Sequence, residues 1–311
     1  MNMDLLERIM LPERVRIPFL GGMWYRYLTK KRRKQIFSLD VSALKLNNEP
    51  RKHKIVCTLT SFPDRIESAQ YTIRSLFNQT MKPDRIVLWL AEEEFENIVL
   101  PDCIKELQDR GLEVRYCENM FGHKRYYQLI DEQKDDELIV MFDDDILFPP
   151  YLVQRLYETW EKHPECIVCD RGQLLAFQNG EVLNPGYWST NSEVGLTEGS
   201  YCLLASPGGG CLIPPKALYK DANNCELIRK YALKTGDIWL MFMAVQNDTR
   251  IMRTYRYHRI FVLSEDEQKV QLGKEAIYQG RYLNTFYALR EAYPHAYANM
   301  MLELKNEHQE R

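Results

Sequence analysis

The feature that most constrains the fold is a regular alternation between short apolar runs and amphipathic segments across residues 54–142. The apolar runs have the length of buried strands, and the segments between them place apolar residues at helical spacing. Alternating strands and helices build a mostly parallel α/β sheet with helices on both faces. The expected strands are residues 54–60, 85–90, 112–116 and 137–142, and the expected helices are residues 65–78, 101–110 and 122–133.

The second half of the chain is less regular. We expect helices at residues 151–162 and 237–245, strands at 166–169 and 250–263, and a long polar loop at 178–199. That loop is rich in Gly, Asn, Ser and Thr, which is typical of irregular connections. The predicted organisation is an N-terminal appendage (1–50), a main α/β domain (51–265) divided after residue 150, and a C-terminal helical extension (266–311).

Charge and cysteine content exclude some functional classes. The net charge of −3 over 311 residues leaves no positive excess to neutralise phosphates, so a general nucleic-acid binder is not expected. A chain of this length needs no disulfide framework, and we interpret the eight cysteines as reduced core thiols of a cytosolic protein. Cys166 and Cys169 have a metal-like spacing, but no second pair completes a zinc site, so a buried strand is the preferred interpretation.

The N-terminal region combines basic and aromatic residues. It lacks the pattern of a secretory signal, and no apolar run reaches the roughly 18–20 residues that span a bilayer. Residues 15–38 contain no Asp or Glu, and Lys and Arg alternate there with Phe, Trp and Tyr. This composition suits docking to an anionic membrane surface, and the alternative is a solvated basic helix packed on the main domain. We expect a cytoplasmic protein, peripheral on the inner face of the membrane.

Three aspartates stand at the end of a predicted strand. Residues 137–142 lead directly into Asp143, Asp144 and Asp145, whose charges repel one another unless a cation compensates them. In an extended chain Asp143 and Asp145 point to the same side and Asp144 to the other. Two such carboxylates can share Mg²⁺ or Mn²⁺, with phosphate oxygens completing the shell. The alternative is a solvated acidic turn, which the buried strand before it disfavours.

The aspartates and the alternating elements together resemble the GT-A glycosyltransferases, in particular bacterial family-2-like and exostosin-like transferases, over about residues 52–263. The resemblance implies the GT-A fold and a nucleotide-sugar donor, such as a UDP-sugar, bound through Mn²⁺ or Mg²⁺. It makes Asp145 the direct metal ligand and places Asp143 against the ribose, or against the metal through water. Because the triple aspartate allows a shifted register, Asp144 is also a candidate cofactor-binding residue. Residues 51–150 would form the nucleotide-binding half and residues 151–265 the acceptor half.

A second segment, from Lys234 to Ala244, is similar to the acidic motif that these transferases carry at a helix start. Gly236 stands where the first acidic residue of the motif is usual, so only Asp237 matches. In inverting members this Asp is the general base that deprotonates the acceptor hydroxyl. The alternative is that Asp237 only caps the helix.

The loop after the first strand also matches the family. There the resemblance implies that Ser61 and Arg65 contact the nucleotide, and the alternative is an ordinary strand-to-helix turn in which Ser and Asp act as caps. Lys124 occupies a position where related transferases carry a lysine ahead of the Asp-x-Asp strand. It would contact the phosphate or sugar of the donor, or else lie on a solvated helix face.

Three further positions come from the second half of the chain. Gly209 and Gly210 resemble the glycine-rich stretch where the family's backbone approaches the donor sugar, and a plain loop is the alternative. His258 would be a further metal ligand, as in some GT-A enzymes, or a structural histidine. Trp188 would stack on a sugar ring or cover the core.

These expectations converge on a metal-dependent glycosyltransferase. Its acceptor would be a glycan or a lipid-linked glycan in cell-surface polysaccharide synthesis, which is an implication of the resemblance alone. Two alternatives stay open. One is a nucleotidyl- or phosphotransferase with the same metal cradle. The other is a catalytically inactive nucleotide-sugar-binding protein. This alternative stays open because Gly236 stands in place of the first acidic residue of the motif.

Overall fold

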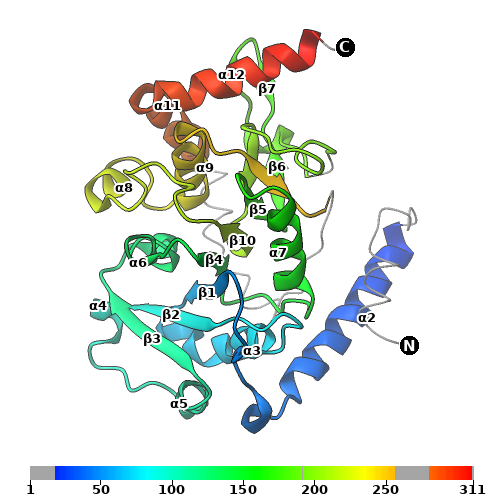
Figure 1. Ribbon diagram of the computed structural model, residues 1–311, viewed down its shortest axis with the longest axis vertical. Coiled ribbons are helices and arrows are strands. Elements are labelled where there is room, and N and C mark those ends of the chain that lie inside the picture. The colour runs from blue at the N-terminus through cyan, green and yellow to red at the C-terminus, as the bar shows by residue number, and fades with distance from the viewer. Residues whose placement is uncertain (1–17, 191, 256–279, 310–311) are drawn as a thin grey trace.

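The computed structural model describes residues 18–190, 192–255 and 280–309 (Figure 1). Within these residues the chain has a mixed α/β architecture on a seven-stranded sheet, with strand order β11-β5-β10-β4-β1-β2-β3. Neighbouring strands are parallel except where β10 pairs with β4 and with β5. The strands are β1 (Lys54–Thr60), β2 (Arg85–Ala91), β3 (Leu112–Cys117), β4 (Glu137–Phe142), β5 (Ile167–Cys169), β10 (Gly209–Ile213) and β11 (Ile251–Arg253).

Helices cover both faces of this sheet. In β4, Leu138, Val140 and Phe142 pack into one buried cluster, while Ile139 and Met141 pack into another. A strand buried on both faces reads as a continuous apolar run, which is why the sequence predicts it well. One face is covered by α3 (Ile66–Phe77), α5 (Asp102–Gln108) and α7 (Leu152–Lys162), and the other by α8 (Cys225–Tyr231), α9 (Gly236–Gln246), α11 (Arg281–Ala292) and α12 (Pro294–Gln309). The predicted α/β fold class is therefore confirmed.

The order of the strands defines where a ligand can bind. The chain runs from β1 outward to β2 and β3, and then returns to place β4 on the other side of β1. The strands β1 and β4 are parallel, and Leu59 pairs with Phe142 at their carboxyl ends. In open α/β sheets the crevice outside the carboxyl ends at such a reversal is the usual ligand site. The residues that follow Thr60 and Phe142 therefore lie where a binding site is expected.

Most predicted elements agree with the structure, and residues 54–60 and 137–142 coincide with β1 and β4. Residues 122–133 do not form the single helix expected there. They contain the 3₁₀ turn η3 (Phe121–Arg125) and the short α6 (Leu129–Glu132). The backbone leaves the helical conformation at Tyr126, whose φ is −140° and ψ −29°, so η3 does not continue directly into a longer helix. Of the strand expected at 250–263, β11 covers the start, and residues 256–263 lie outside the described part.

The region expected to be a polar loop contains a small hairpin. Strands β7 (Phe177–Gln178) and β8 (Glu181–Val182) are joined by Asn179 and Gly180, both with positive φ. An Asn-Gly pair between two strands is a strong hairpin signal, so this hairpin could have been predicted from the sequence. Outside the main sheet, β6 (Gly172–Leu174) also pairs with β9 (Leu203–Ala205). The remaining short elements are α4 (Glu92–Phe95), η1 (Val41–Ala43), η2 (Pro63–Arg65) and η4 (Pro185–Tyr187).

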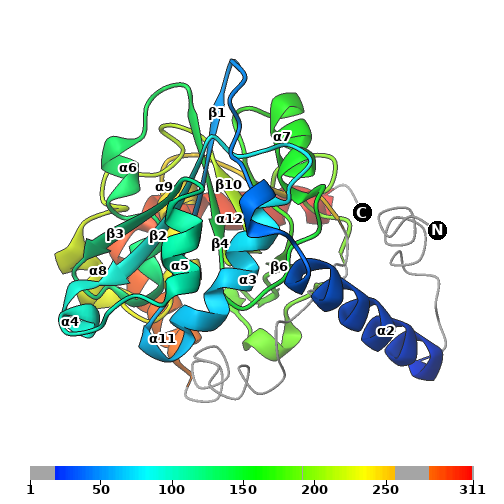
Figure 2. The same cartoon turned by 90° about the horizontal axis from the view of Figure 1, so that it is seen from below.

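The basic N-terminal segment forms helix α2 (Pro18–Phe37), which lies at the periphery of the fold (Figure 2). Phe37 stacks on Tyr71 of α3, with ring centroids 3.8 Å apart. Leu28 and Ile36 are buried, so one side of the helix packs inward. No helix in the described ranges combines the length and the apolar character that crossing a membrane requires. The predicted domain boundaries stay predictions.

The cysteines are all free thiols. Six are buried, whereas Cys103 and Cys225 are partly exposed. Cys169 lies in β5 and Cys166 directly before it, in agreement with the strand interpretation of that pair. Burial raises the pKa of the Cys166 thiol to about 12, so this thiol is neutral at physiological pH.

Candidate functional site

Asp143, Asp144 and Asp145 directly follow the last residue of β4, at the carboxyl edge of the sheet. Their side chains alternate in exposure: that of Asp143 is 47% exposed, that of Asp144 is 8% and that of Asp145 is 14%. Residues 144 and 145 form a turn, and one nitrogen of Arg65 contacts both side chains, so the prediction that Asp144 points away from Asp145 is wrong. Their exposed fractions make Asp143, followed by Asp145, the carboxylates that a ligand can reach most easily.

Asp144 is held in place by contacts with residues that follow β1 and with a residue of α3. The hydroxyl of Ser61, just beyond β1, donates to Asp144 Oδ2 at 2.5 Å, and Arg65 Nη1 lies 3.1 Å from Oδ1. Thr72 of α3 donates to the main-chain carbonyl of Asp144 at 2.6 Å. Burial raises the pKa of the Asp144 carboxyl, although the hydrogen bond from Ser61 and the charge of Arg65 oppose the rise. This side chain holds the loop in place, and its contact with a cofactor stays a prediction.

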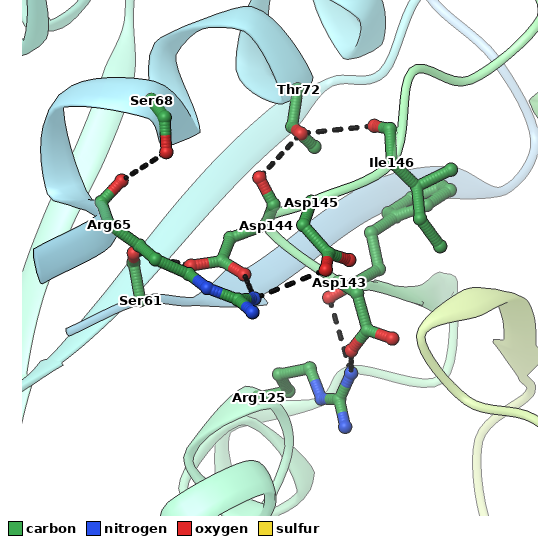
Figure 3. A network of polar contacts seen from close by, with 10 residues as sticks. Ser61, Arg65, Ser68, Thr72, Arg125, Asp143, Asp144, Asp145 and Ile146 are labelled. Atoms are coloured by element: carbon green, nitrogen blue, oxygen red, sulfur yellow. Dashed lines mark hydrogen bonds and ion pairs between the residues drawn. The ribbon is translucent and has the colours of Figure 1, made fainter. Parts of the chain in front are cut away.

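Two arginines compensate the charge of the three carboxylates. Arg65 bridges two of them, since its Nη1 also lies 3.3 Å from Asp145 Oδ2. Arg125 forms an ion pair with Asp143. Figure 3 shows the two side chains approaching the aspartates from different sides. The positive charges of Arg65 and Arg125 therefore offset the repulsion among the three aspartates that is apparent in the sequence.

The sequence interpretation named Lys124, but the structure brings its neighbour Arg125 to the aspartates. Both belong to η3, a 3₁₀ turn in which successive side chains point in different directions. Lys124 is buried, and its Nζ lies 3.6 Å from Glu94 Oε2. Arg125 instead reaches Asp143. No periodic pattern in the sequence separates these two basic residues, so only the folded turn shows which one faces the site.

A glycine-rich segment passes directly beside Asp143. The main-chain N–H of Asp143 donates to the carbonyl of Gly208 at 2.8 Å. A Cβ added at Gly208 would lie 1.9 Å from the Asp143 carboxylate, so a side chain there would displace it. The predicted Gly209 and Gly210 lie in β10 instead. Gly210 has a φ of +101° and its missing Cβ faces Leu152 of α7, so it serves packing.

Asp237 lies in the first turn of α9, within reach of the charge of Arg125, which pairs with Asp143. Its Oδ1 accepts from the N–H of Ile238 at 3.0 Å, and its Oδ2 accepts from the hydroxyl of Tyr282. Burial raises the pKa of the Asp237 carboxyl, opposed by these hydrogen bonds and by the charge of Arg125. The negative charge of Asp143 in turn helps to raise the pKa of the Tyr282 hydroxyl. Asp237 and the aspartates after β4 thus belong to one electrostatically connected site.

The glycine before Asp237 has a structural explanation. A Cβ added at Gly236 would lie 3.3 Å from the ring of His123, tighter than most contacts of this kind. His123 Nε2–H donates to the carbonyl of Ala232 at 2.9 Å, and Nδ1 accepts from the hydroxyl of Tyr126. Burial lowers the pKa of His123 to about 4, so the ring is neutral near pH 7. The ring therefore crowds the place where the family's first acidic residue is expected.

Of two other predicted positions, the structure describes Trp188 and not His258. Trp188 is 7% exposed, and its Nε1–H donates to the carbonyl of Leu183 at 2.8 Å, so it covers the core. Its ring meets that of Tyr282 edge to face, with centroids 5.9 Å apart. His258 lies outside the described residues. Tyr282 itself is a residue that the sequence interpretation missed, because it belongs to a helix 45 positions beyond Asp237.

The number and exposure of the carboxylates after β4 determine how they can serve as ligands of a divalent cation. Among residues 18–190, 192–255 and 280–309, no group of three or more His, Cys, Asp or Glu side chains is arranged to hold a metal. Asp143 and Asp145 offer two reachable carboxylates, and Mg²⁺ is commonly bound by one or two carboxylates together with phosphate oxygens. The donor set therefore suits a cation that arrives with a diphosphate.

Comparisons with known proteins found solved structures of low similarity and no match in sequence. No protein-family model matches the chain, and no curated protein matches its sequence. A mannosyltransferase from Pyrobaculum calidifontis, solved in complex with GDP-Man and Mn²⁺, is 11% identical, with 91% of this chain and 83% of that chain covered and a TM-score of 0.40. The 4-diphosphocytidyl-2C-methyl-D-erythritol synthase from Anaerococcus prevotii is 13% identical, with 72% of this chain and 99% of that chain covered and a TM-score of 0.42.

Proposed function

We propose that this protein is a metal-dependent glycosyltransferase that moves a sugar from a nucleotide-sugar donor to a hydroxyl of a glycan or lipid-linked glycan. One observation carries the proposal. Asp143 and Asp145 lie at the reversal of strand order between β1 and β4, and Arg125, which pairs with Asp143, also acts on the charge of Asp237. A diphosphate site and a separate carboxylate base are what sugar transfer to a hydroxyl requires.

The donor would bind at the ends of β1 and β4. Ser61 and Arg65 follow β1 and already contact the aspartate loop, so they lie where the family's nucleotide is expected. Asp143 and Asp145 would hold the divalent cation, which supplies Lewis-acid stabilisation of the departing nucleoside diphosphate. A UDP-sugar is the first donor to test, and cell-surface polysaccharide synthesis is the setting we propose.

The two arginines make binding of cation and diphosphate interdependent. Without ligands, Arg125 pairs with Asp143 and Arg65 with Asp145, so a cation alone must compete with both guanidinium groups. A diphosphate would give those groups new partners, because guanidinium matches phosphate oxygens in charge and shape. Cation and nucleotide should therefore bind more tightly together than separately.

The acceptor would meet Asp237. Its pKa is raised by burial, which makes the ionised carboxylate a stronger base than an exposed aspartate. Deprotonation of the acceptor hydroxyl by this carboxylate would let the oxygen attack the anomeric carbon opposite the leaving diphosphate. The proposed reaction therefore inverts the configuration at that carbon.

Thermal stabilisation by nucleotides tests the proposal. UDP and GDP are each added with and without Mn²⁺ to the wild-type protein, to Asp145→Ala and to the control Asp135→Ala, an exposed aspartate that precedes β4. We expect UDP and Mn²⁺ together to raise Tm by more than the sum of their separate effects, because ligands that bind only the folded state stabilise it. The shift should disappear in Asp145→Ala and persist in Asp135→Ala.

The other outcomes separate the alternatives. No shift with either nucleotide, in a wild-type protein that folds normally, would remove the proposal. Stabilisation by CTP with Mn²⁺, followed by release of pyrophosphate, would indicate a nucleotidyltransferase. UDP binding without transfer from any sugar nucleotide would indicate a binding protein.

The same proposal includes contact of α2 with an anionic membrane, where a lipid-linked acceptor would reside. The helix contains no Asp or Glu, and Arg26, Lys30 and Lys34 are exposed on it. Each basic residue near an anionic surface contributes about 1 kcal/mol, so Lys30→Glu with Lys34→Glu should weaken binding roughly 30-fold or more. Cosedimentation with phosphatidylglycerol vesicles measures this.

The control for the membrane prediction is Lys216→Glu, an exposed lysine outside α2. It should bind the vesicles like the wild type, and added salt should weaken binding of both. Equal binding of the double variant and the wild type would contradict a role for α2.

A further inference from the structure

Tyr282 links the C-terminal part of the chain to the candidate base. It lies in the first turn of α11, and its hydroxyl donates to Asp237 Oδ2. The residue is half-buried, and its ring packs edge to face on Trp188. The residues expected from sequence to form a C-terminal extension therefore contribute a side chain to the site.

Helix α11 is fixed to α9 on the side that carries Tyr282. Thr285 Oγ1 lies 3.0 Å from Thr235 Oγ1, directly before α9. Phe286 is fully buried and meets Phe242 of α9 edge to face, with centroids 5.0 Å apart. Residues three and four positions apart share one face of a helix, so these contacts also set the position of Tyr282. The hydroxyl is held at Asp237 by packing that does not depend on any ligand.

We propose that Tyr282 is a positioning residue for Asp237, which fixes the plane of the carboxylate so that a free lone pair faces the acceptor hydroxyl. This inference rests on the proposed function, in which Asp237 is the base. One oxygen is already engaged by the N–H of Ile238 and the other by Tyr282. A carboxylate has about four acceptor sites, so two bonds orient it and leave sites for the acceptor. With both oxygens engaged, the carboxylate cannot rotate freely.

The hydroxyl also acts on the charge of the carboxylate. A donor that bonds to the ionised form stabilises that form, and here it opposes the effect of burial. The other groups that face Asp237 are the guanidinium of Arg125, which favours ionisation, and the N–H of Ile238. His123 lies against the neighbouring Gly236 but is neutral near pH 7. Tyr282 thus favours the ionised base, together with Arg125.

The test is a titration that needs no substrate. The protein is labelled with ¹³C at the aspartate carboxyl carbon, and the signal of Asp237 is assigned by its loss in Asp237→Asn. We expect its midpoint to move to higher pH in Tyr282→Phe, because one donor to the ionised form is gone. The control is Tyr287→Phe on the same helix, whose hydroxyl lies near the carbonyl of Val182 and not at the site. It should leave the midpoint unchanged.

An unchanged midpoint in a folded Tyr282→Phe protein would overturn the inference. If that variant does not fold, 3-fluorotyrosine at position 282 provides a second measurement. Its more acidic hydroxyl donates more strongly, so the Asp237 midpoint should then move to lower pH, and no movement would again overturn the inference. In either form, stabilisation by UDP with Mn²⁺ should be retained, since Tyr282 bonds to Asp237 and not to the aspartates after β4.

The inference and the proposed function can fail separately. If Asp237→Asn transfers sugar as fast as the wild type, the base assignment fails, whatever the titration shows. If Asp237→Asn is inactive while Tyr282→Phe leaves the midpoint in place, only the positioning role of Tyr282 fails.

Discussion

Replacing Asp237 with Asn is expected to slow sugar transfer by about 10²- to 10⁴-fold, the usual contribution of a general base. Asparagine keeps the shape of the side chain but cannot take a proton from the acceptor hydroxyl. Donor binding should be preserved, because UDP and Mn²⁺ would contact Asp143 and Asp145 instead. The measurement is kcat with the donor and acceptor found by screening, alongside the thermal shift with UDP and Mn²⁺. A rate within a few-fold of the wild type would exclude Asp237 as the base.

The same substitution has a predictable effect on stability. A carboxyl group whose pKa is raised by folding costs stability as pH rises, because the unfolded chain ionises first. The cost in stability is absent at pH values below the pKa of Asp237 in the unfolded chain. It is complete at pH values above its pKa in the folded protein. Asp237→Asn removes it, so the Tm of the variant relative to the wild type should increase as the pH rises above the unfolded pKa of about 4. A constant difference in Tm would show that Asp237 ionises as freely in the fold as in the unfolded chain.

Asp248 provides the matched control for both measurements. It follows the other end of α9, and hydrogen bonds from Asn299 and His295 lower its pKa. Asp248→Asn should leave the transfer rate unchanged. Its stability relative to the wild type should fall as pH rises, which is the opposite direction from Asp237→Asn.

Replacing Arg65 with Ala is expected to lower the free energy of unfolding by about 3–5 kcal/mol near pH 7, the usual effect of removing one partner of a buried ion pair. Asp144 would stay buried beside two further carboxylates, with Ser61 as its remaining side-chain hydrogen-bond donor in the described structure. Urea unfolding measures the loss. Added Mn²⁺ should restore part of the stability, because the cation would replace the missing positive charge at Asp145.

The loss in Arg65→Ala should shrink as pH falls. The pKa of Asp144 is already raised by burial, and without Arg65 it should rise further, so the carboxyl takes up a proton earlier on acidification. The control is Arg74→Ala, an arginine on α3 that contacts Gln70 and the ring of Tyr71 but no carboxylate. An equal loss for both variants, at all pH values and without recovery in Mn²⁺, would contradict a special role of Arg65 at the aspartates.

The strands and the loop that presents the aspartates could be predicted from consecutive residues. The apolar runs at 54–60 and 137–142 became β1 and β4 without change, since a strand buried on both faces is apolar throughout. Ser61 and Arg65 were also predicted to lie at the site, and both contact the aspartates. Their roles in binding a nucleotide stay predictions, as does the metal role of Asp145.

Other parts of the site were not predictable in this way. Lys124 and Arg125 are adjacent basic residues, and the sequence favoured the one that pairs with Glu94. Gly208, the glycine next to the Asp143 carboxylate, begins the predicted glycine-rich stretch, but only Gly209 and Gly210 were named there as binding residues. Each choice depends on the direction in which one side chain points within an irregular turn, and short-range periodicity does not determine that direction.

The sequence by itself determined a mostly parallel α/β sheet, the end of the strand where carboxylates gather, and a carboxylate at a helix start. These features follow from local patterns of burial and charge, which consecutive residues contain. Only the tertiary structure decided that Arg65 and Arg125 neutralise the aspartates, and that Tyr282 reaches Asp237. The physical reason is distance along the chain: Arg65 and Asp144 are 79 positions apart, and Asp237 and Tyr282 are 45 apart. Such contacts exist only once the sheet has brought the ends of its strands together.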